Sequence, residues 1–434
     1  MNFDRSHPCR LREFAGAVVS LLAVVPAAGA QTWTPLGSEF QVNSSTVGHQ
    51  TNPEIAADAA GNFVVVWDGE GLGDEVGILG QRYFSDGSPA AAEFWANVTT
   101  VGAQQRPSVG SADNGDFVIV WDDAMASGAQ DVWAQRFSSS GVRVGSNFRV
   151  NETLEPAQYA SDIAVLPDGR FVITWSARVL PAARARGAWT NAEVIARRFA
   201  ADGAPLGAEF QVNTFTPDQD NSPAISTTSD GGFVVAWDRN AEDGDSWEIR
   251  GQRFNPVGGK VGAEFQVNSY TTGLRYGPSI AALADDAFVV VWSSRDQDGD
   301  GRGVYGQRFG PTGIPAGGEF QVNTYTTGPQ GEATVLAASG GGFVVAWEGP
   351  EVHAKRYQSD GNPVGGEYVL NSYLTALQGS PALSGDPDGD FVATWMSFGQ
   401  DGDGQGIFAQ RFAGFIFMDG FESGDLSKWS SSNP

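Results

Sequence analysis

One short phrase occurs seven times along the chain, and this repetition constrains the fold more than any other feature. The phrase is Phe-Val-Val-Val-Trp or a close variant, and its tryptophans lie 54, 54, 62, 55, 55 and 48 positions apart. Two further phrases recur with it, Gly-Gln-Arg-Phe and Glu-Phe-Gln-Val-Asn, together with a weaker Pro-x-Ile-Ala run before an Asp-Gly or Gly-Gly turn. Each unit of about 55 residues therefore predicts four short strands.

Four strands in a repeat of this length are typical of propeller blades. An immunoglobulin-like sandwich needs roughly 100 residues for one domain, and a parallel β-helix repeats at a shorter interval. The last unit lacks its Glu-Phe-Gln-Val-Asn strand, whereas an extra copy at 39–43 precedes the first unit. We therefore predict an all-β fold, a seven-bladed β-propeller of four-stranded blades. In this ring the N-terminal strand 39–43 completes the last blade and covers an open sheet edge.

The combination of the three phrases resembles a repeat of secreted and surface proteins of bacteria. In that family Glu-Phe-Gln-Val-Asn, Gly-Gly-Phe-Val-Val-Val-Trp and Gly-Gln-Arg-Phe recur, sometimes beside calcium-binding segments. The similarity covers residues 38–412. It implies a propeller-like, adhesin-associated protein outside the cell, and it carries no activity that transfers to individual residues.

The two ends of the chain differ from the repeats. Residues 1–30 contain a basic start, an apolar run and Ala28-Gly29-Ala30, which together predict a secretory signal peptide. We assign 31–412 to the propeller and 413–434 to a C-terminal tail, which resembles an export or surface element of exported bacterial proteins. No later segment approaches the ~20 apolar residues of a membrane span. The expected location is secreted, either extracellular or at the cell surface, with the periplasm as an alternative.

The charge of the chain limits its partners. It has 26 basic and 51 acidic residues, for a formal charge of −25, which opposes binding to nucleic acid. Glycans, cell-surface proteins and cations remain as candidate partners. The sequence does not indicate an oligomeric state.

The repeated tryptophan and arginine are expected to be structural, because a position filled identically in every unit serves a need that all blades share. Function is expected where the repeat pattern breaks and where loops gather on one face. Loops between the second and third strands of the units are acidic, and we place in them, among others, Asp68, Asp122 and Asp123.

Alternating aspartates within these loops suggest calcium, which is the one cofactor that the sequence suggests. Carboxylates separated by single residues direct several oxygens to one point, and glycines permit the required curvature. An EF-hand would need a glutamate where Gln307 stands. The alternative is a solvated turn, because Asp and Gly also favour turns. The candidate metal ligands are Asp296, Asp298 and Asp300, then Asp243 and Asp245, and finally Asp401 and Asp403.

The third unit departs most from the repeat, with an insertion at 176–193. Arg184, Arg186 and Trp189 make it basic and aromatic, and they are candidate ligand-binding residues for an anionic sugar or a partner protein. The alternative is a tolerated surface insertion.

No catalytic motif is present, and we assign no catalytic residue. Outside the signal only His49 and His353 remain, and the only cysteine lies within the signal. We therefore expect an extracellular binding or adhesion protein with an acidic loop face and an unidentified ligand. The alternative is a secreted carbohydrate-active enzyme, a hydrolase or lyase, that uses carboxylates on the same face.

Overall fold

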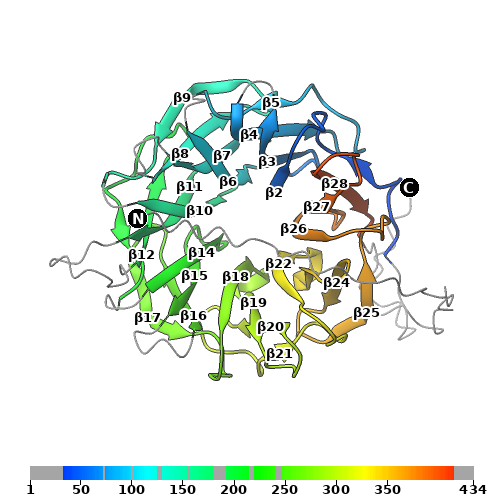
Figure 1. Cartoon of the computed structure of the whole chain (residues 1–434). Coiled ribbons are helices and arrows are strands. Elements are labelled where there is room, and N and C mark those ends of the chain that lie inside the picture. The colour runs from blue at the N-terminus through cyan, green and yellow to red at the C-terminus, as the bar shows by residue number, and fades with distance from the viewer. Residues whose placement is uncertain are drawn as a thin grey trace, which may run out of the picture.

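The computed structural model describes residues 33–71, 74–98, 102–124, 130–154, 157–178, 192–214, 219–240 and 247–414. These residues form strands and connecting turns, with two short 3₁₀ turns at Ala284–Asp286 and Ser339–Gly341. Figure 1 shows the sheets standing radially around a central axis, each with one strand nearest the centre. The expected all-β, propeller-like fold is confirmed.

Each repeat supplies strands in the order that the sequence predicts, from the central axis outward. The innermost strands are β2 (Gln50–Ala57), β6 (Ala103–Ser111), β10 (Gln158–Val165), β14 (Gln219–Thr227), β18 (Arg275–Ala282), β22 (Gly331–Ala337) and β26 (Gln378–Gly385). The second strands are β3 (Phe63–Gly71), β7 (Phe117–Ala124), β11 (Phe171–Arg178), β15 (Phe233–Asn240), β19 (Phe288–Arg295), β23 (Phe343–Glu348) and β27 (Phe391–Phe398). The third strands are β4 (Asp74–Tyr83), β8 (Gln130–Phe137), β12 (Ala192–Phe199), β16 (Trp247–Phe254), β20 (Arg302–Phe309), β24 (Val352–Tyr357) and β28 (Gln405–Phe412). The outermost strands are β1 (Phe40–Gln41), β5 (Phe94–Trp95), β9 (Arg143–Arg149), β13 (Phe210–Gln211), β17 (Lys260–Gln266), β21 (Phe320–Gln321) and β25 (Pro363–Val369).

The strands form antiparallel sheets that follow the chain order. Five sheets have four strands each, namely β2–β5, β6–β9, β18–β21, β22–β25 and β26–β28 with β1. Strands β10–β17 form one larger sheet, whose halves β10–β13 and β14–β17 meet only through a parallel pair between Ala192 and Gln219. The innermost strands contact one another in sequence around the axis, and β26 contacts β2.

The ends of the repeat region meet as the sequence predicts. Strand β1 pairs antiparallel with β28, with Phe40 opposite Ala409. Beside this pair, the backbone amide of Ile407 donates to Oδ1 of Asn43 at 2.7 Å, and the amide of Ser372 donates to Glu39 at 2.5 Å. The N-terminal strand therefore completes the sheet of the last repeat.

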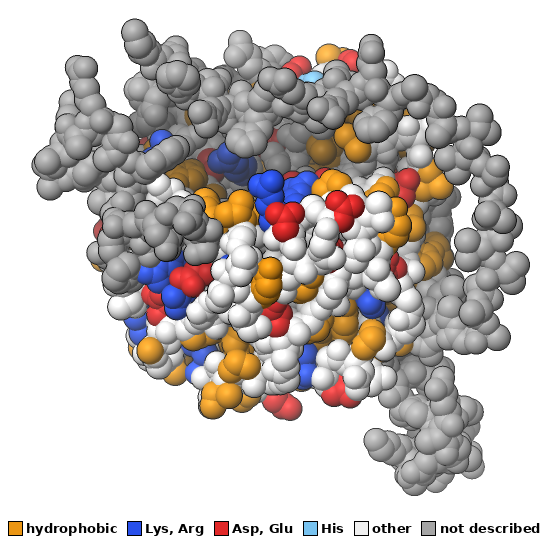
Figure 2. All heavy atoms as spheres, turned by 60° about the horizontal axis from the view of Figure 1, so that its bottom comes forward, with side chains coloured by type: hydrophobic (Ala, Val, Ile, Leu, Met, Phe, Trp, Pro, Cys, Tyr) orange, Lys and Arg blue, Asp and Glu red, His pale blue; other side chains and the backbone are white. Residues whose placement is uncertain are grey.

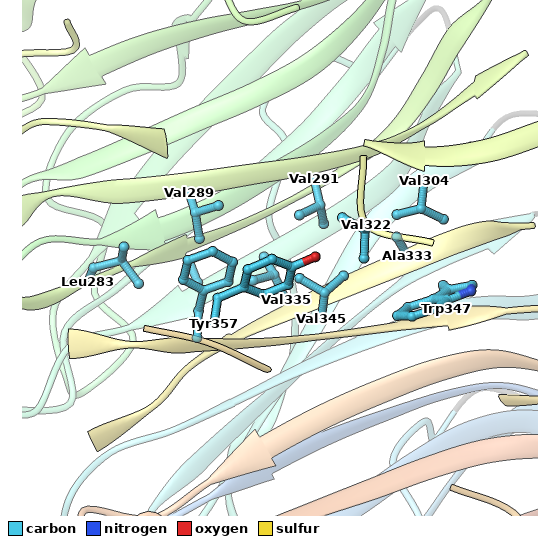
Figure 3. Packing of buried hydrophobic residues seen from close by; sticks show 12 residues of the cluster. Leu283, Val289, Val291, Val304, Val322, Ala333, Val335, Val345, Trp347 and Tyr357 are labelled. Carbon is cyan, nitrogen blue, oxygen red and sulfur yellow. The ribbon is translucent and has the colours of Figure 1, made fainter. Parts of the chain in front are cut away.

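Both faces of each second strand are buried, which explains why its sequence does not alternate between apolar and polar residues. In β19, Val289 and Val291 pack toward the following sheet, whereas Val290 and Trp292 pack toward the preceding one. Figure 3 shows the first of these clusters, where Val345 and Trp347 of β23 face the valines of β19. Apolar contact between neighbouring sheets is thus the core of the ring.

The repeated aromatic residues have the same neighbours in each unit. The phenylalanine that begins each second strand stacks on the last ring of the third strand, with centroids 4.7–5.0 Å apart in all seven units. The seven tryptophans are fully buried. Three of them donate their indole N–H to the start of the innermost strand, as Trp175 does to Gln158 at 2.7 Å.

The repeated arginine and asparagine join parts of the ring, which confirms a structural role. Arg136 donates to the carbonyl of Asp202 at 2.6 Å in a turn of the next repeat, and Arg411 donates to the carbonyl of Asp86 at 2.7 Å. The asparagine that ends each Glu-Phe-Gln-Val-Asn phrase is buried, and its Oδ1 accepts a backbone amide of the third strand in all seven units.

The outer surface carries both signs of charge. In Figure 2, basic, acidic and hydrophobic side chains are interspersed over the described part of the face in view. Within the part of the chain that the structure describes, no helix is long and apolar enough to span a membrane.

Candidate functional site

The innermost strands enclose a channel of about 620 Å³ along the axis of the ring. Each of these strands contains a bulge, where its register with the second strand shifts. In each strand the first residue of the bulge lines the channel. Its φ lies between 46° and 61°, a left-handed conformation that is uncommon for residues other than glycine. These residues are Asn52, Arg106, Ala160, Ser222, Gly277, Glu332 and Ser380.

The channel wall is chemically uneven. The second residue after each left-handed position is acidic in only two strands, as Glu54 of β2 and Asp162 of β10. The wall formed by β14 and β18 has no charged side chain and consists of small residues, prolines and two isoleucines around Ala224 and Gly277. The channel therefore has one side with carboxyl groups and another side with uncharged side chains.

Glu54 has a carboxyl group whose charged form is disfavoured. Its side chain is open to the channel, yet the surrounding wall and the negative charge of Asp162 raise its pKa to about 8. No protein donor bonds to this carboxyl among the described residues. The uncharged form of Glu54 is therefore favoured, and its side chain faces the channel.

Asp162 also has a pKa that burial raises, but unlike Glu54 it accepts several hydrogen bonds. Its Oδ1 accepts hydrogen bonds from the Ser108 hydroxyl and the Ile163 amide, each at 2.8 Å, and its Oδ2 accepts the amide of Ile225 at 2.9 Å. Burial raises the pKa of Asp162 above its usual value, and the three donors, which stabilise the charged form, reduce this rise without reversing it. Glu54 and Asp162 thus form a pair of carboxyl groups with unequal environments.

A second carboxyl pair lies at the β22 side of the channel. Glu332 lines the channel and accepts a hydrogen bond from the Ser380 hydroxyl at 3.0 Å. Burial and the charge of Glu332 raise the pKa of the neighbouring Glu348 to about 8, whereas Arg302 favours its charged form. The charged form of Glu348 is therefore disfavoured.

Three aspartates that the sequence places in acidic loops are instead buried inside strands. Asp68, Asp122 and Asp123 belong to β3 and β7, because these strands continue beyond their tryptophans. Asp68 and Asp122 accept the amides of Arg106 and Ala160, the bulge residues of the next innermost strand, at 2.8 and 2.7 Å. The loop assignment for these residues was wrong, and they join neighbouring sheets.

Two of the predicted calcium loops lie within the described residues. Asp296, Asp298 and Asp300 occupy the connection between β19 and β20, and Asp401 and Asp403 occupy that between β27 and β28. The sheet β22–β25 separates these two loops, so the structure does not bring them together.

The carboxylates of both loops bond within the protein in the same way. Asp298 accepts from Asn323 at 3.2 Å, and Asp401 accepts from Asn43 at 3.3 Å. Asp300 and Asp403 each accept the amide of an inter-repeat glycine. Among the described residues no group of three or more His, Cys, Asp or Glu side chains could hold a metal ion, and calcium stays a prediction.

Several predicted features lie outside the described residues. These are Asp243 and Asp245, the insertion residues Arg184, Arg186 and Trp189, the signal segment 1–30, and the tail from 415 onward. Glu54 and Asp162 were missed by the sequence analysis. A signal for them was present, because the same position holds Ser, Thr or Ala in the other repeats.

Comparisons with known proteins show similarity in structure and not in sequence. No protein-family model and no curated protein matches the chain. A protein of unknown function from Dyadobacter fermentans is similar over 90% of this chain and 100% of its own, with a TM-score of 0.53 and 12% identity. An α-L-arabinanase from Penicillium chrysogenum in complex with arabinobiose is similar over 70% of this chain and 92% of its own, with a TM-score of 0.50 and 14% identity.

The second similarity corrects the functional expectation from sequence. We expected a binding or adhesion protein that does not catalyse, partly because the repeats contain no catalytic motif. A solved structure that shares the fold is instead a carbohydrate-degrading enzyme. The main expectation was therefore wrong. At 14% identity the similarity itself concerns the fold.

Proposed function

We propose that the chain is a carbohydrate-active hydrolase that cleaves glycosidic bonds in its central channel. The observation that carries the proposal is the pair formed by Glu54 and Asp162. Burial raises the pKa of both groups, but among the described residues only Asp162 receives hydrogen bonds, three of them, that stabilise its charged form. Hydrolysis of a glycoside requires a carboxylic acid and a carboxylate acting together.

In this proposal the two carboxyl groups have different roles. Glu54 donates its proton to the leaving-group oxygen, because its pKa of about 8 keeps it protonated at neutral pH. Asp162 acts as the carboxylate, either activating water or stabilising the positive charge that develops on the sugar ring. Residues Ala224 and Gly277 on the neutral side leave room for a sugar ring opposite the acids.

We infer further that the ring has seven blades and that the enzyme is exported. The blade count is supported by the single pair that joins the halves of the larger sheet, and by the separate apolar clusters on either side of that junction. Export rests on the predicted signal peptide at 1–30. An exported hydrolase would meet polysaccharides outside the cell. Arabinan is the first substrate to test, because arabinobiose is the ligand of the similar arabinanase.

The test is release of sugar by the purified protein spanning 31–434. It would be incubated with arabinan, xylan and a mixed-linkage glucan, and new reducing ends would be measured. Glu54→Gln and Asp162→Asn are each expected to lower kcat by about a hundredfold or more, as loss of an acid or base does in other enzymes. Activity of the wild type should decline as the pH rises through about 8, because Glu54 then loses its proton.

A matched control is Asp113→Asn, which removes an exposed carboxyl outside the channel. This variant should retain wild-type activity. Absence of cleavage on a broad glycan panel would overturn the proposal. Full activity of Glu54→Gln would likewise exclude Glu54 as the group that protonates the leaving-group oxygen.

A further inference from the structure

We propose that Ser108 is a positioning residue that orients Asp162 and favours its charged form in the channel site. The inference rests on the proposed hydrolase, and it assigns a role to a serine that lies on the strand between the two acids. The Ser108 hydroxyl donates to Oδ1 of Asp162 at 2.8 Å, and the side chain is largely buried, with 8% of the residue exposed.

The other repeats show which hydrogen bond of Asp162 is also made at the same strand position elsewhere and which one is additional. At the same strand position in β18, Ser279 accepts the amide of Val335 on the next innermost strand at 3.2 Å. Asp162 accepts the corresponding amide, that of Ile225, at 2.9 Å. This hydrogen bond between neighbouring strands needs only one acceptor oxygen, and a serine supplies it. The hydrogen bond therefore does not explain why the position in β10 holds a carboxylate.

The hydrogen bond from Ser108 is different, because it comes from the preceding strand β6. It approaches Oδ1, which also accepts the Ile163 amide, so that this oxygen is occupied by two donors. Oδ2 accepts only the Ile225 amide among the described residues and keeps a lone pair free. The carboxylate is thus held from both sides, with one oxygen able to accept a proton or a hydroxyl group.

Charged groups around Asp162 have their own partners. Arg106 of β6 lies 3.5 Å from Asp122 of β7, and Asp220 of β14 accepts the indole N–H of Trp237. Arg178 of β11 lies over the ring of Tyr159 at 5.3 Å. The remaining groups on packed strands are Asp123, which accepts from Gln104, Asp131, which accepts from Asn151, and Arg136, which donates to Asp202. Glu54 faces Asp162 with like charge when ionised.

The chain offers a matched set of variants. Ser108→Ala removes the donor to Asp162. Ser279→Ala removes a hydroxyl from the same position of another channel strand, where it bonds only to the backbone. Ser108→Thr keeps the hydroxyl, and Thr334 shows that an innermost strand accommodates threonine at this position.

Two measurements test the proposal independently. The first is the pKa of Asp162 from its ¹³C carboxyl signal, which is assigned through its loss in Asp162→Asn. Ser108→Ala should raise this pKa by about one unit, because a hydrogen bond to a charged group stabilises it by that order. Ser108→Thr should restore it. The second is the pH profile of kcat/KM, whose acid limb should move to higher pH by the same amount.

An unchanged pKa of Asp162 in Ser108→Ala would overturn the proposal, and so would an equal shift in Ser279→Ala. A shifted pKa in a protein that cleaves no glycan would support the role of Ser108 and overturn the hydrolase. Melting temperatures of the serine variants should agree within a few degrees, which would confirm that the shift does not follow from loss of folding.

Discussion

Closure of the ring by the N-terminal strand makes a prediction about a single buried side chain. Asn43 accepts the amide of Ile407 at 2.7 Å across a separation of 364 residues, and it donates to the carbonyl of Ser45 at 2.8 Å and to Asp401 at 3.3 Å. Asn323 makes similar contacts within one repeat, accepting the amide of Val304 at 2.8 Å and donating to Tyr325 and Asp298, whereas Asn43 also donates to Oε1 of Gln50 at 3.0 Å. Both side chains are 3% exposed. Asn323→Ala is therefore a control for Asn43→Ala.

The size of the effect follows from the group that loses its partner. Without Asn43, the amide of Ile407 stays buried with no acceptor, which costs about 1–3 kcal/mol. The bonds that the amide group donates add about 0.5–1.5 kcal/mol each, reduced where water replaces the lost partner. We expect Asn43→Ala to lower the free energy of unfolding by about 2–4 kcal/mol, and Asn323→Ala to lower it by the same amount.

The assay is urea unfolding followed by tryptophan fluorescence, since the buried tryptophans report the whole ring. If the ends of the chain are joined in solution as the interior repeats are, the two variants unfold at similar urea concentrations below the wild type. A stable Asn43→Ala beside a destabilised Asn323→Ala would refute the reasoning, because the terminal strand would then contribute little to the fold.

Two other outcomes follow from buried and surface carboxylates. Burial raises the pKa of Asp238 from 3.8 to about 7, so the wild type should lose on the order of 4 kcal/mol of stability as the pH rises from 4 to 8. Asp238→Asn should lose correspondingly less in urea unfolding at the two pH values, whereas parallel losses would exclude this carboxyl as the cause. We also propose that calcium orders the loops of Asp298 and Asp401, so calcium should raise the melting temperature, and less so in Asp298→Asn. If millimolar calcium produces no heat in a calorimetric titration and no shift of the melting temperature, the calcium proposal is wrong.

Most of the fold could be predicted from the sequence because the same contacts are made in every repeat. A buried ring pair or an amide acceptor such as Asn323 is needed in each unit, so the residue recurs and its strand can be recognised. The terminal strand could be placed because Asn43 carries the same signature as Asn323. Asp68 was misplaced because strand ends are set by backbone pairing. That pairing continues beyond Trp67 irrespective of the charge of the next side chain.

The candidate site could not be found in this way, because it depends on residues that occur in one or two repeats. Glu54 and Asp162 occupy a position that elsewhere needs only a small side chain, and the hydrogen bond made by Ser279 shows what the scaffold requires there. A carboxyl group at such a position places a polar group where its charged form is disfavoured, in a strand that would fold without it. The fold does not require a carboxyl group at this position. A catalytic role in the channel explains why it is there, and the measurements on Glu54 and Asp162 test that explanation.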